Sequence, residues 1–230
     1  MMKYVYQITV VVIIMSLLML FSQCNREDSA DVNQDKIYCE YELFYNSNVD
    51  KTYARATFRF SNEFGTKLEL TAPSQVTFKG DVLTFKSALA YYEKEYAGFQ
   101  SSGVFEWTDT DGNGYSNAIV VHPIGQAVGV DTIPTDSTFE LFWTGDSLGQ
   151  NELVKLTINS SQNGNLQVFV QDNLHSKSVL LNKTQLQLLG QGEATLWLDR
   201  YYSPGLAQKN AAGGKIRGIY RPDNIQVYLN

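Results

Sequence analysis

Histidine, cysteine and proline are scarce in this chain. Its 230 residues include 2 histidines, 2 cysteines and 5 prolines. A metal site rich in histidine and a framework of several disulfides are therefore excluded, because each needs more ligands or thiols than the chain has. Neither His122 nor His175 belongs to the His-Glu-x-x-His metal-binding pattern. A surface or loop histidine without a catalytic role is the simplest interpretation of both.

Basic residues are also few relative to acidic ones. The chain has 18 Lys and Arg against 24 Asp and Glu, which gives a formal net charge of −6. Proteins that bind nucleic acid place a cluster of basic side chains against the phosphates, and no such cluster is visible in the sequence. We therefore expect no nucleic-acid partner.

Residues 1–23 are predicted to be a signal peptide for export. Lys3 is followed by an uncharged apolar run from Ile8 to Phe21, an order that is typical of export signals. The run is shorter than the ~20 apolar residues that span a membrane. It ends at residues 20–24, Leu-Phe-Ser-Gln-Cys, which resemble the lipobox of bacterial lipoproteins.

The lipobox resemblance implies that the signal is cut before Cys24 and that Cys24 carries the lipid. Gln23 stands where such sequences usually have Gly, Ala or Ser. An uncleaved anchor helix or a plain secretory signal is the alternative. Acyl chains contribute ~0.8 kcal/mol per buried methylene, so a lipid on Cys24 would hold the rest of the chain on a membrane.

Residues 24–36 are predicted to be an acidic flexible tether. They combine Asp and Glu with Ser, Asn and Gln and have little apolar content, a composition that does not support a packed core. The start of the tether is similar to the acidic export signal that follows the lipid-bearing cysteine in some Gram-negative lipoproteins. This similarity implies an outer-membrane lipoprotein of the cell envelope that is exposed on the cell surface, with the membrane as its partner through the N-terminal lipid.

The rest of the chain has the alternation of a β-protein. Polar and apolar side chains alternate in many short segments, among them 37–45, 54–60 and 194–198, and Gly, Asn, Asp, Ser or Pro separate these segments. A period of two is typical of strands with one buried face. We predict an all-β fold of two antiparallel immunoglobulin-like β-sandwiches in tandem. One larger jelly roll is the alternative.

Pro and Gly interrupt the alternation near residues 123–136, which places the predicted domain boundary there. The first sandwich is expected at 37–124, the linker at 125–136 and the second sandwich at 137–230. No helical period lasts longer than a few turns.

Only two short helices are predicted, at Ser87–Tyr96 and at Lys183–Leu189, the second with Thr184 as its cap. Cys39 lies in an alternating run and is expected to be a small buried hydrophobe. The tryptophans also lie inside alternating runs and are expected in the core: Trp107, Trp143 and Trp197.

Segments of the second half resemble uncharacterised two-part lipoproteins of Gram-negative bacteria. The resemblance rests on residues 140–146, 151–154, 185–186, 192–200 and 212–216. It implies a lipid-anchored protein built of two parts, and it carries no activity with it.

The sharpest local motif lies at residues 109–114, Asp-Thr-Asp-Gly-Asn-Gly. Asp109, Asp111 and Asn113 place oxygen ligands two residues apart, as in the first half of a calcium loop. The twelfth position of such a loop is Val120 here instead of Glu, and Asx and Gly residues are also typical of hairpin turns. A hairpin turn without a metal is the main interpretation, and a structural calcium site is the alternative. No other cofactor is predicted.

Five tyrosines are the candidate ligand-binding residues. Tyrosine offers a large contact area at a small entropic cost, so these side chains are suited to stack on sugar rings or to anchor a protein partner. Packing in the core is the alternative for each of them. The loop at 203–214 is a candidate contact loop. The candidate tyrosines are Tyr91, Tyr92, Tyr96, Tyr201 and Tyr202.

These features predict a lipid-anchored, non-enzymatic binding or structural module with an unknown protein or glycan partner. A carbohydrate-binding lipoprotein is the first alternative, and it needs aromatic side chains in a row on one exposed face. A β-sandwich hydrolase is the second alternative, and it needs carboxylates or a histidine that meet in a cleft. Glu93 and Glu95 are a candidate carboxylate pair, although a solvated face is the simpler interpretation. No catalytic residue is predicted.

Overall fold

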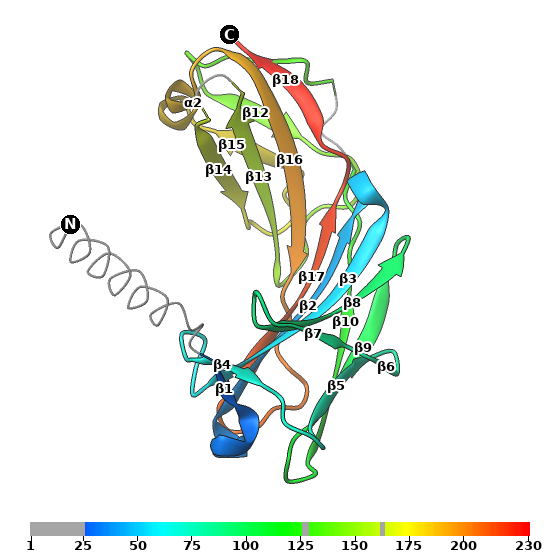
Figure 1. Cartoon of the computed structure of the whole chain (residues 1–230). Helices are drawn as coiled ribbons and strands as arrows, with labels where there is room; N and C mark the ends of the chain where they lie inside the picture. Colours follow the sequence, from blue (N-terminus) through cyan, green and yellow to red (C-terminus); the bar gives the residue numbers. More distant parts are fainter. Residues whose placement is uncertain (1–25, 126–128, 162–163) are drawn as a thin grey trace, which may run out of the picture.

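The computed structural model describes residues 26–125, 129–161 and 164–230. The predicted signal peptide at 1–23 and the predicted lipid-bearing Cys24 lie outside the described residues. The chain forms a crescent with one sheet running along its length (Figure 1). The predicted all-β class is confirmed, because strands dominate the described residues.

The strands follow one another along the chain with short connections. The first nine are β1 (Arg26–Asp28), β2 (Ile37–Asn46), β3 (Lys51–Phe60), β4 (Lys67–Glu69), β5 (Gln75–Phe78), β6 (Asp81–Val82), β7 (Thr84–Lys86), β8 (Tyr91–Ala97) and β9 (Ser102–Thr108). The others are β10 (Gly114–Val120), β11 (Thr132–Ile133), β12 (Phe139–Phe142), β13 (Glu152–Ser160), β14 (Leu166–Gln171), β15 (Ser178–Leu181), β16 (Gly192–Tyr202), β17 (Gly214–Arg221) and β18 (Ile225–Leu229). Within the described residues, the helical elements are η1 (Ser29–Asp31), η2 (Gln34–Lys36), η3 (Ser47–Val49) and α2 (Lys183–Leu189).

A 12-stranded sheet extends through both halves of the molecule. Its main path runs β1-β4-β3-β2-β17-β16-β13-β14, with β8 and β7 beside β3 and with β18 and β11 beside β16. Most neighbours are antiparallel, as predicted, whereas β1 with β4, β17 with β2 and β11 with β18 are parallel. A 4-stranded sheet, β10-β9-β5-β6, and a 2-stranded sheet, β12-β15, complete the fold.

The buried side chains divide into two hydrophobic cores. The first core combines residues of 37–121 with Ile216 of β17. The second core contains buried residues from Ile124 to Leu229 and includes Leu186 and Leu189 of α2. Two cores agree with two sandwiches instead of one jelly roll.

The chain returns from the second half to the first before it ends. β17 pairs in parallel over its whole length with Cys39–Asn46 of β2, so a strand from the second half of the chain belongs to the first sandwich. The predicted boundaries of 37–124, 125–136 and 137–230 follow the chain in order and therefore miss this return. The pairing of residues so far apart in sequence leaves no local signal.

β17 and β18 together run beside the whole of β16. At the C-terminal end of β16, Tyr202 pairs with Gly218 and Arg200 pairs with Tyr220 of β17. The N-terminal part of β16, from Gly192 to Leu196, pairs with β18. Between these two sets of pairs, residues 197–199 of β16 lie opposite residues 221–224, so one side has an extra residue, as in a β-bulge. Pro222 lies in this extra stretch and has no N–H to donate.

A buried ion pair lies where the two cores meet. The Arg200 guanidinium donates to both carboxylate oxygens of Glu152, at 3.1 and 2.6 Å, and to the carbonyls of Pro123, Asp146 and Ser147 at 3.0–3.2 Å. Both side chains are almost fully buried. A buried charge pair is retained at low cost only when its remaining donors and acceptors are also satisfied, and here every guanidinium nitrogen has an acceptor.

The protonation of Glu152 follows from its neighbours. Burial by itself would raise the pKa of Glu152, but the hydrogen bonds from Arg200 and from the Gly149 backbone N–H outweigh it, and the pKa lies below its ordinary value. His122 also contacts the Glu152 carboxylate and packs on the Tyr202 ring at 4.7 Å. His122 is therefore part of this junction. It lies in the loop after β10 with a side chain that is 42% exposed, which is the position expected of a loop histidine.

One of the two predicted helices is present. α2 has the predicted bounds, but its cap is Asn182, whose side chain accepts from the Gln185 N–H at 2.9 Å. The helix predicted at Ser87–Tyr96 is wrong, because residues from Tyr91 onward form β8 and pair with β3. Backbone pairing with a preformed neighbour overrides a weak local preference.

The part of the predicted tether that the structure describes, 26–36, is folded onto the first sandwich. β1 pairs in parallel with β4, and the Ser29 and Gln34 side chains are buried. Asn210 donates to the Gln34 and Ile37 carbonyls at 2.7 and 2.8 Å. The expectation of a flexible segment is wrong here because hydrogen bonds from a distant part of the chain replace the apolar contacts that the segment lacks.

The described residues contain no helix that combines the length and the apolar character needed to cross a membrane.

Replacing Gly218 by alanine is expected to destabilise the protein by about 1–3 kcal/mol, because overpacking forces backbone shifts. A Cβ at Gly218 would lie 2.1 Å from the Val120 carbonyl oxygen, and both groups belong to backbone that is held by strands. Gly205→Ala is the control, since a Cβ there meets nothing within 4 Å. Urea unfolding of both variants measures the difference, and equal stabilities would contradict the close approach of β17 to β10.

Candidate functional site

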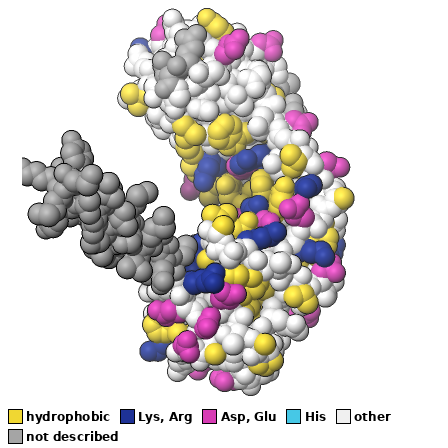
Figure 2. All heavy atoms as spheres, in the orientation of Figure 1, with side chains coloured by type: hydrophobic (Ala, Val, Ile, Leu, Met, Phe, Trp, Pro, Cys, Tyr) yellow, Lys and Arg dark blue, Asp and Glu magenta, His cyan; other side chains and the backbone are white. Residues whose placement is uncertain are grey.

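The outer face of the large sheet is the strongest candidate for a functional surface. On β2 every second side chain, beginning with Ile37, is buried in the first core, and the others point to the opposite face and are only half-buried. We call this opposite side of the sheet the open face. Figure 2 shows hydrophobic, basic and acidic side chains gathered together on the inner side of the crescent.

A row of large apolar side chains crosses the open face at right angles to the strands. Each member lies directly opposite the next one on the neighbouring strand, and all except the buried Ile219 are half-buried. The phenyl ring of Phe44 stacks on the Tyr53 ring with centroids 6.0 Å apart. We call this row the apolar stripe: Tyr53, Phe44, Ile219, Tyr201 and Leu153.

The apolar stripe joins the two halves of the molecule. It begins on β3 and β2 in the first sandwich, crosses β17, and continues on β16 and β13 in the second. Four strand spacings of ~4.8 Å give it a length of about 19 Å. The return of β17 to the first sandwich is what makes this row continuous.

A row of alternating charges flanks the apolar stripe on one side. Glu93, Arg55, Glu42 and Arg217 lie opposite one another on β8, β3, β2 and β17. Arg55 donates to Glu93 at 2.7 Å and to Glu42 at 3.1 Å, and Arg217 donates to Glu42 at 2.7 Å. We call this row the charge ladder. Opposite charges in directly facing pairs stabilise neighbouring strands.

Arg55 connects the charge ladder to the aromatic rings. Its guanidinium carbon lies 4.7 Å from the Tyr53 ring centroid, 5.7 Å from that of Phe44 and 5.8 Å from that of Tyr91. Burial would lower the pKa of Arg55, but the hydrogen bond to Glu93 and the charge of Glu42 outweigh it and raise the pKa. Arg55 therefore stays charged and holds the rings by cation–π contacts.

A second charged row flanks the apolar stripe on its other side. Arg221 donates to both carboxylate oxygens of Asp199 at 2.6 and 2.7 Å, and these bonds raise the pKa of Arg221. Its guanidinium carbon lies 5.3 Å from the Phe44 ring centroid and 5.9 Å from that of Trp197. The ammonium of Lys155 lies 5.0 Å from the Tyr201 ring centroid.

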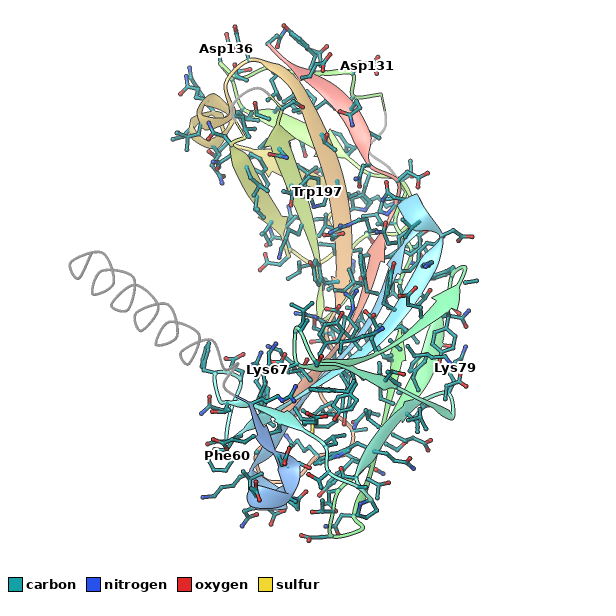
Figure 3. The ribbon with its side chains drawn as sticks, viewed as in Figure 1. Phe60, Lys67, Lys79, Asp131, Asp136 and Trp197 are labelled. Atoms are coloured by element: carbon teal, nitrogen blue, oxygen red, sulfur yellow. The ribbon has the colours of Figure 1, made fainter. Side chains whose placement is uncertain are left out.

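Trp197 belongs to the open face and not to the core. Its neighbours Leu196 and Leu198 are buried in the second core, so the alternation of β16 turns the Trp197 side chain to the other side (Figure 3). The core prediction is confirmed for Trp107 and Trp143, which are buried, as is Cys39. Alternation alone does not say which of two apolar neighbours is buried.

A hollow of about 170 Å³ adjoins the charge ladder. Its walls carry carboxylates and cations side by side, together with the hydroxyls of Thr57 and Tyr91. Such a wall offers donors and acceptors to one ligand at the same time. The charged residues that line it are Glu40, Glu42, Arg55, Lys215 and Arg217.

The five predicted ligand-binding tyrosines do not form one cluster. Tyr91 and Tyr201 lie on the open face, where burial and the charge of Asp199 raise the pKa of Tyr201 to about 12. Tyr92 is buried in the first core, and the Tyr96 hydroxyl donates to the Phe78 carbonyl at 3.0 Å on the core side. Tyr202 packs on His122 at the junction.

The aromatic residues Phe44, Tyr53 and Trp197 were not predicted as binding residues. Each of them lies in a run of alternating side chains. On β2 and β3 this alternation indicates which side chains face the core, and it does not mark those on the opposite face as a binding surface. A signal that could have located the open face is the series Arg55, Glu42 and Arg217, whose charges alternate with buried apolar side chains along their strands.

Asp109 closes the turn between β9 and β10. Its buried carboxylate accepts from the backbone N–H groups of Asp111 and Asn113 at 3.0 and 2.8 Å and from the Asn113 side chain at 2.9 Å. These bonds are those of an Asx turn. Among the residues that the structure describes, no group of three His, Cys, Asp or Glu side chains is placed to hold a metal ion.

The predicted contact loop at 203–214 packs back on the first sandwich. Gln208 accepts from the Ser116 N–H at 2.7 Å and exchanges two further bonds with Asn117. Asn210 is buried against η2. The loop therefore fastens the returning chain through Gln208 and Asn210, while half of its residues stay exposed.

The candidate carboxylate pair has partners of its own. Glu93 belongs to the charge ladder, and Glu95 pairs with Lys51 at 2.8 Å. Residues 145–149, Gly-Asp-Ser-Leu-Gly, match the Gly-x-Ser-x-Gly pattern of hydrolases, which was not among the predicted sites. In those enzymes the serine lies between a strand and a helix, whereas this segment leads from β12 into β13, and the Ser147 carbonyl binds Arg200.

Comparisons with known proteins show similarity in structure alone. No protein-family model matches the chain. No curated protein sequence matches it either. The FN1–FN3 domains of chicken CNTN1 are 8% identical with a TM-score of 0.29, over 82% of this chain and 66% of that one. A tetra-tandem repeat in the extending region of a large adhesion protein is 13% identical with a TM-score of 0.25, over 84% of this chain and 49% of that one. This chain thus spans about half of the second neighbour.

Asp109→Ala is expected to destabilise the protein by about 1–3 kcal/mol, because three donors of the turn lose their acceptor. Asp111→Ala is the control, since its exposed side chain should contribute within about 0.5 kcal/mol. Thermal unfolding of both variants measures the effect. Millimolar calcium should leave the Tm of the parent protein unchanged, and a calcium-dependent rise that Asp111→Ala abolishes would establish the metal site instead.

Proposed function

We propose that this chain is a lipid-anchored, surface-exposed and non-enzymatic binding module of the cell envelope, which holds its partner on the open face. The all-β sandwich fold is compatible with a binding or structural module. The observation that carries the proposal is the apolar stripe, a row of large side chains that the fold leaves partly exposed across both sandwiches. Rows of exposed apolar side chains with polar rims mark interaction sites.

The arrangement of the open face supports binding more than catalysis. The carboxylates of Glu42, Glu93 and Asp199 are each held by at least one arginine. A carboxylate whose oxygens already accept hydrogen bonds from a guanidinium is not free to exchange a proton with a substrate as a general acid or base. The same pairs fix the rotamers of the long side chains, so the surface is preorganised for a partner.

The anchor is supported by the sequence before the described residues. β1 begins at Arg26, two residues after Cys24, so a lipid on Cys24 would place the first sandwich close to the membrane surface. The chain would then reach away from the membrane along the crescent.

Mass spectrometry of the native protein is expected to show an acylated Cys24 as the first residue. In cells, Cys24→Ser should move the protein from the membrane fraction to the soluble fraction, because the acyl chains supply the membrane affinity. Protease added to intact cells should degrade the parent protein, since it is displayed on the surface. An unmodified Cys24 that follows an intact Met1 would overturn the anchor.

Crosslinking in cells tests the open face itself. A photoreactive benzoylphenylalanine in place of Phe44, the β2 member of the apolar stripe, should give an adduct of higher mass on irradiation. The same group in place of Phe64 is the control, because this side chain is 88% exposed in the turn after β3 and lies outside the open face. Adducts at both positions, or at neither, would contradict binding at the open face.

A further inference from the structure

We infer that the partner held on the open face is an uncharged oligosaccharide chain that lies along the apolar stripe. This inference rests on the proposed function and names the chemical class of its ligand. It draws on three observations: the rings, the paired charges beside them, and the balance of charge on the face.

The rings supply the apolar contact that a sugar needs. A pyranose has C–H groups on its faces and hydroxyls around its edge, so it packs flat on an aromatic side chain while its hydroxyls stay free. Phe44, Tyr53 and Tyr201 lie in one row, with Tyr91 and Trp197 beside it. A length of about 19 Å, at ~4.8 Å per strand, accommodates several sugar units.

The charged rows supply partners for the hydroxyls. Each hydroxyl both donates and accepts, so a neighbouring pair of hydroxyls is matched by a carboxylate next to a guanidinium. The charge ladder repeats this combination with Glu93, Arg55, Glu42 and Arg217 along one side of the rings. Asp199 and Arg221 repeat it on the other side.

The balance of charge selects a neutral ligand. The charge ladder contains two carboxylates and two guanidiniums in mutual contact, which leaves no unpaired cation in this row for an anionic ligand. In the second charged row, the ammonium of Lys155 lies against the Tyr201 ring. The whole chain carries a net charge of −6, which repels polyanions. A polysaccharide of uronic acids is therefore disfavoured, although it keeps the ring hydroxyls of a neutral sugar.

The same charges disfavour a protein partner. The buried centre of a protein interface is enriched in aromatic residues and Arg but depleted of Asp, Glu and Lys, and covering the carboxylate of an ion pair with apolar groups removes its water without replacement. On the open face, each ring of the apolar stripe has a charged side chain within two residues on its own strand. Sugar hydroxyls replace the lost water, whereas an apolar protein patch does not.

Titration of neutral hexasaccharides into the full chain tests the inference. The protein is held in a detergent without a sugar headgroup, and the probes are cellohexaose, maltohexaose, xylohexaose, mannohexaose and, as the anionic comparison, hexagalacturonic acid. At least one neutral probe should bind, as seen by calorimetry, and hexagalacturonic acid should bind more weakly than that probe. Tyr53→Ala should weaken binding by about tenfold, which corresponds to ~1.4 kcal/mol of lost contact.

Matched variants separate binding from folding. Phe44→Leu keeps a half-buried apolar side chain but removes the ring, so it should lower affinity while the Tm stays near that of the parent. Phe64→Ala removes an exposed ring outside the open face and should leave the affinity unchanged. Equal affinities of Phe44→Leu and the parent would overturn the role of the rings.

The crosslinked adduct at position 44 distinguishes the two proposals. An adduct whose acid hydrolysate contains neutral sugars supports the inference. A protein adduct, failure of every neutral probe at millimolar concentration, or tighter binding of hexagalacturonic acid overturns the glycan ligand and leaves the binding module standing. The absence of any adduct at position 44 overturns both.

Discussion

The pairing of β16 with β17 and β18 is the constraint on which the rest of the structure depends. One strand, β16, lies beside a partner that belongs to the first sandwich at one end and to the second at the other. Hydrogen bonds of a single sheet therefore connect the cores, and the Arg200–Glu152 pair fills the place where they meet. Two sandwiches joined only by a linker would be free to rotate, whereas a shared sheet fixes their relation.

The continuity of the sheet gives the open face its character. A row of side chains crosses from β3 to β13 only because each strand keeps its register with the next, and a slip of one residue would turn the whole row into the core. The charges beside this row neutralise one another across strands. An uncovered sheet face with such pairs is polar enough to stay in water and still presents rings to a ligand.

The class of fold and most strands could be predicted from the sequence, because apolar and polar residues alternate along a strand that is buried on one face. The sequence was also sufficient for α2, whose apolar spacing is local. It was not sufficient for β8, where Tyr92 faces the core while Glu93 meets Arg55 of another strand. The candidate site was accessible only in part: Tyr91 and Tyr201 were singled out, but the charge ladder joins Glu42 to Arg217, which are 175 residues apart. Such contacts follow from topology and leave no local pattern.

The parallel pairing of β17 with β2 sets the order in which the protein can be completed. β2 is among the first strands to be synthesised, yet one of its edges stays open until residues 214–221 have been made. Ile216 also fills part of the first core, so the N-terminal sandwich remains unfinished while the C-terminal one is assembled. During this interval an unpaired strand edge is exposed to other chains. The N-terminal sandwich thus depends on residues 214–221 being made before β2 pairs with another chain, and a product that lacks them would leave the first core incomplete as well as the second.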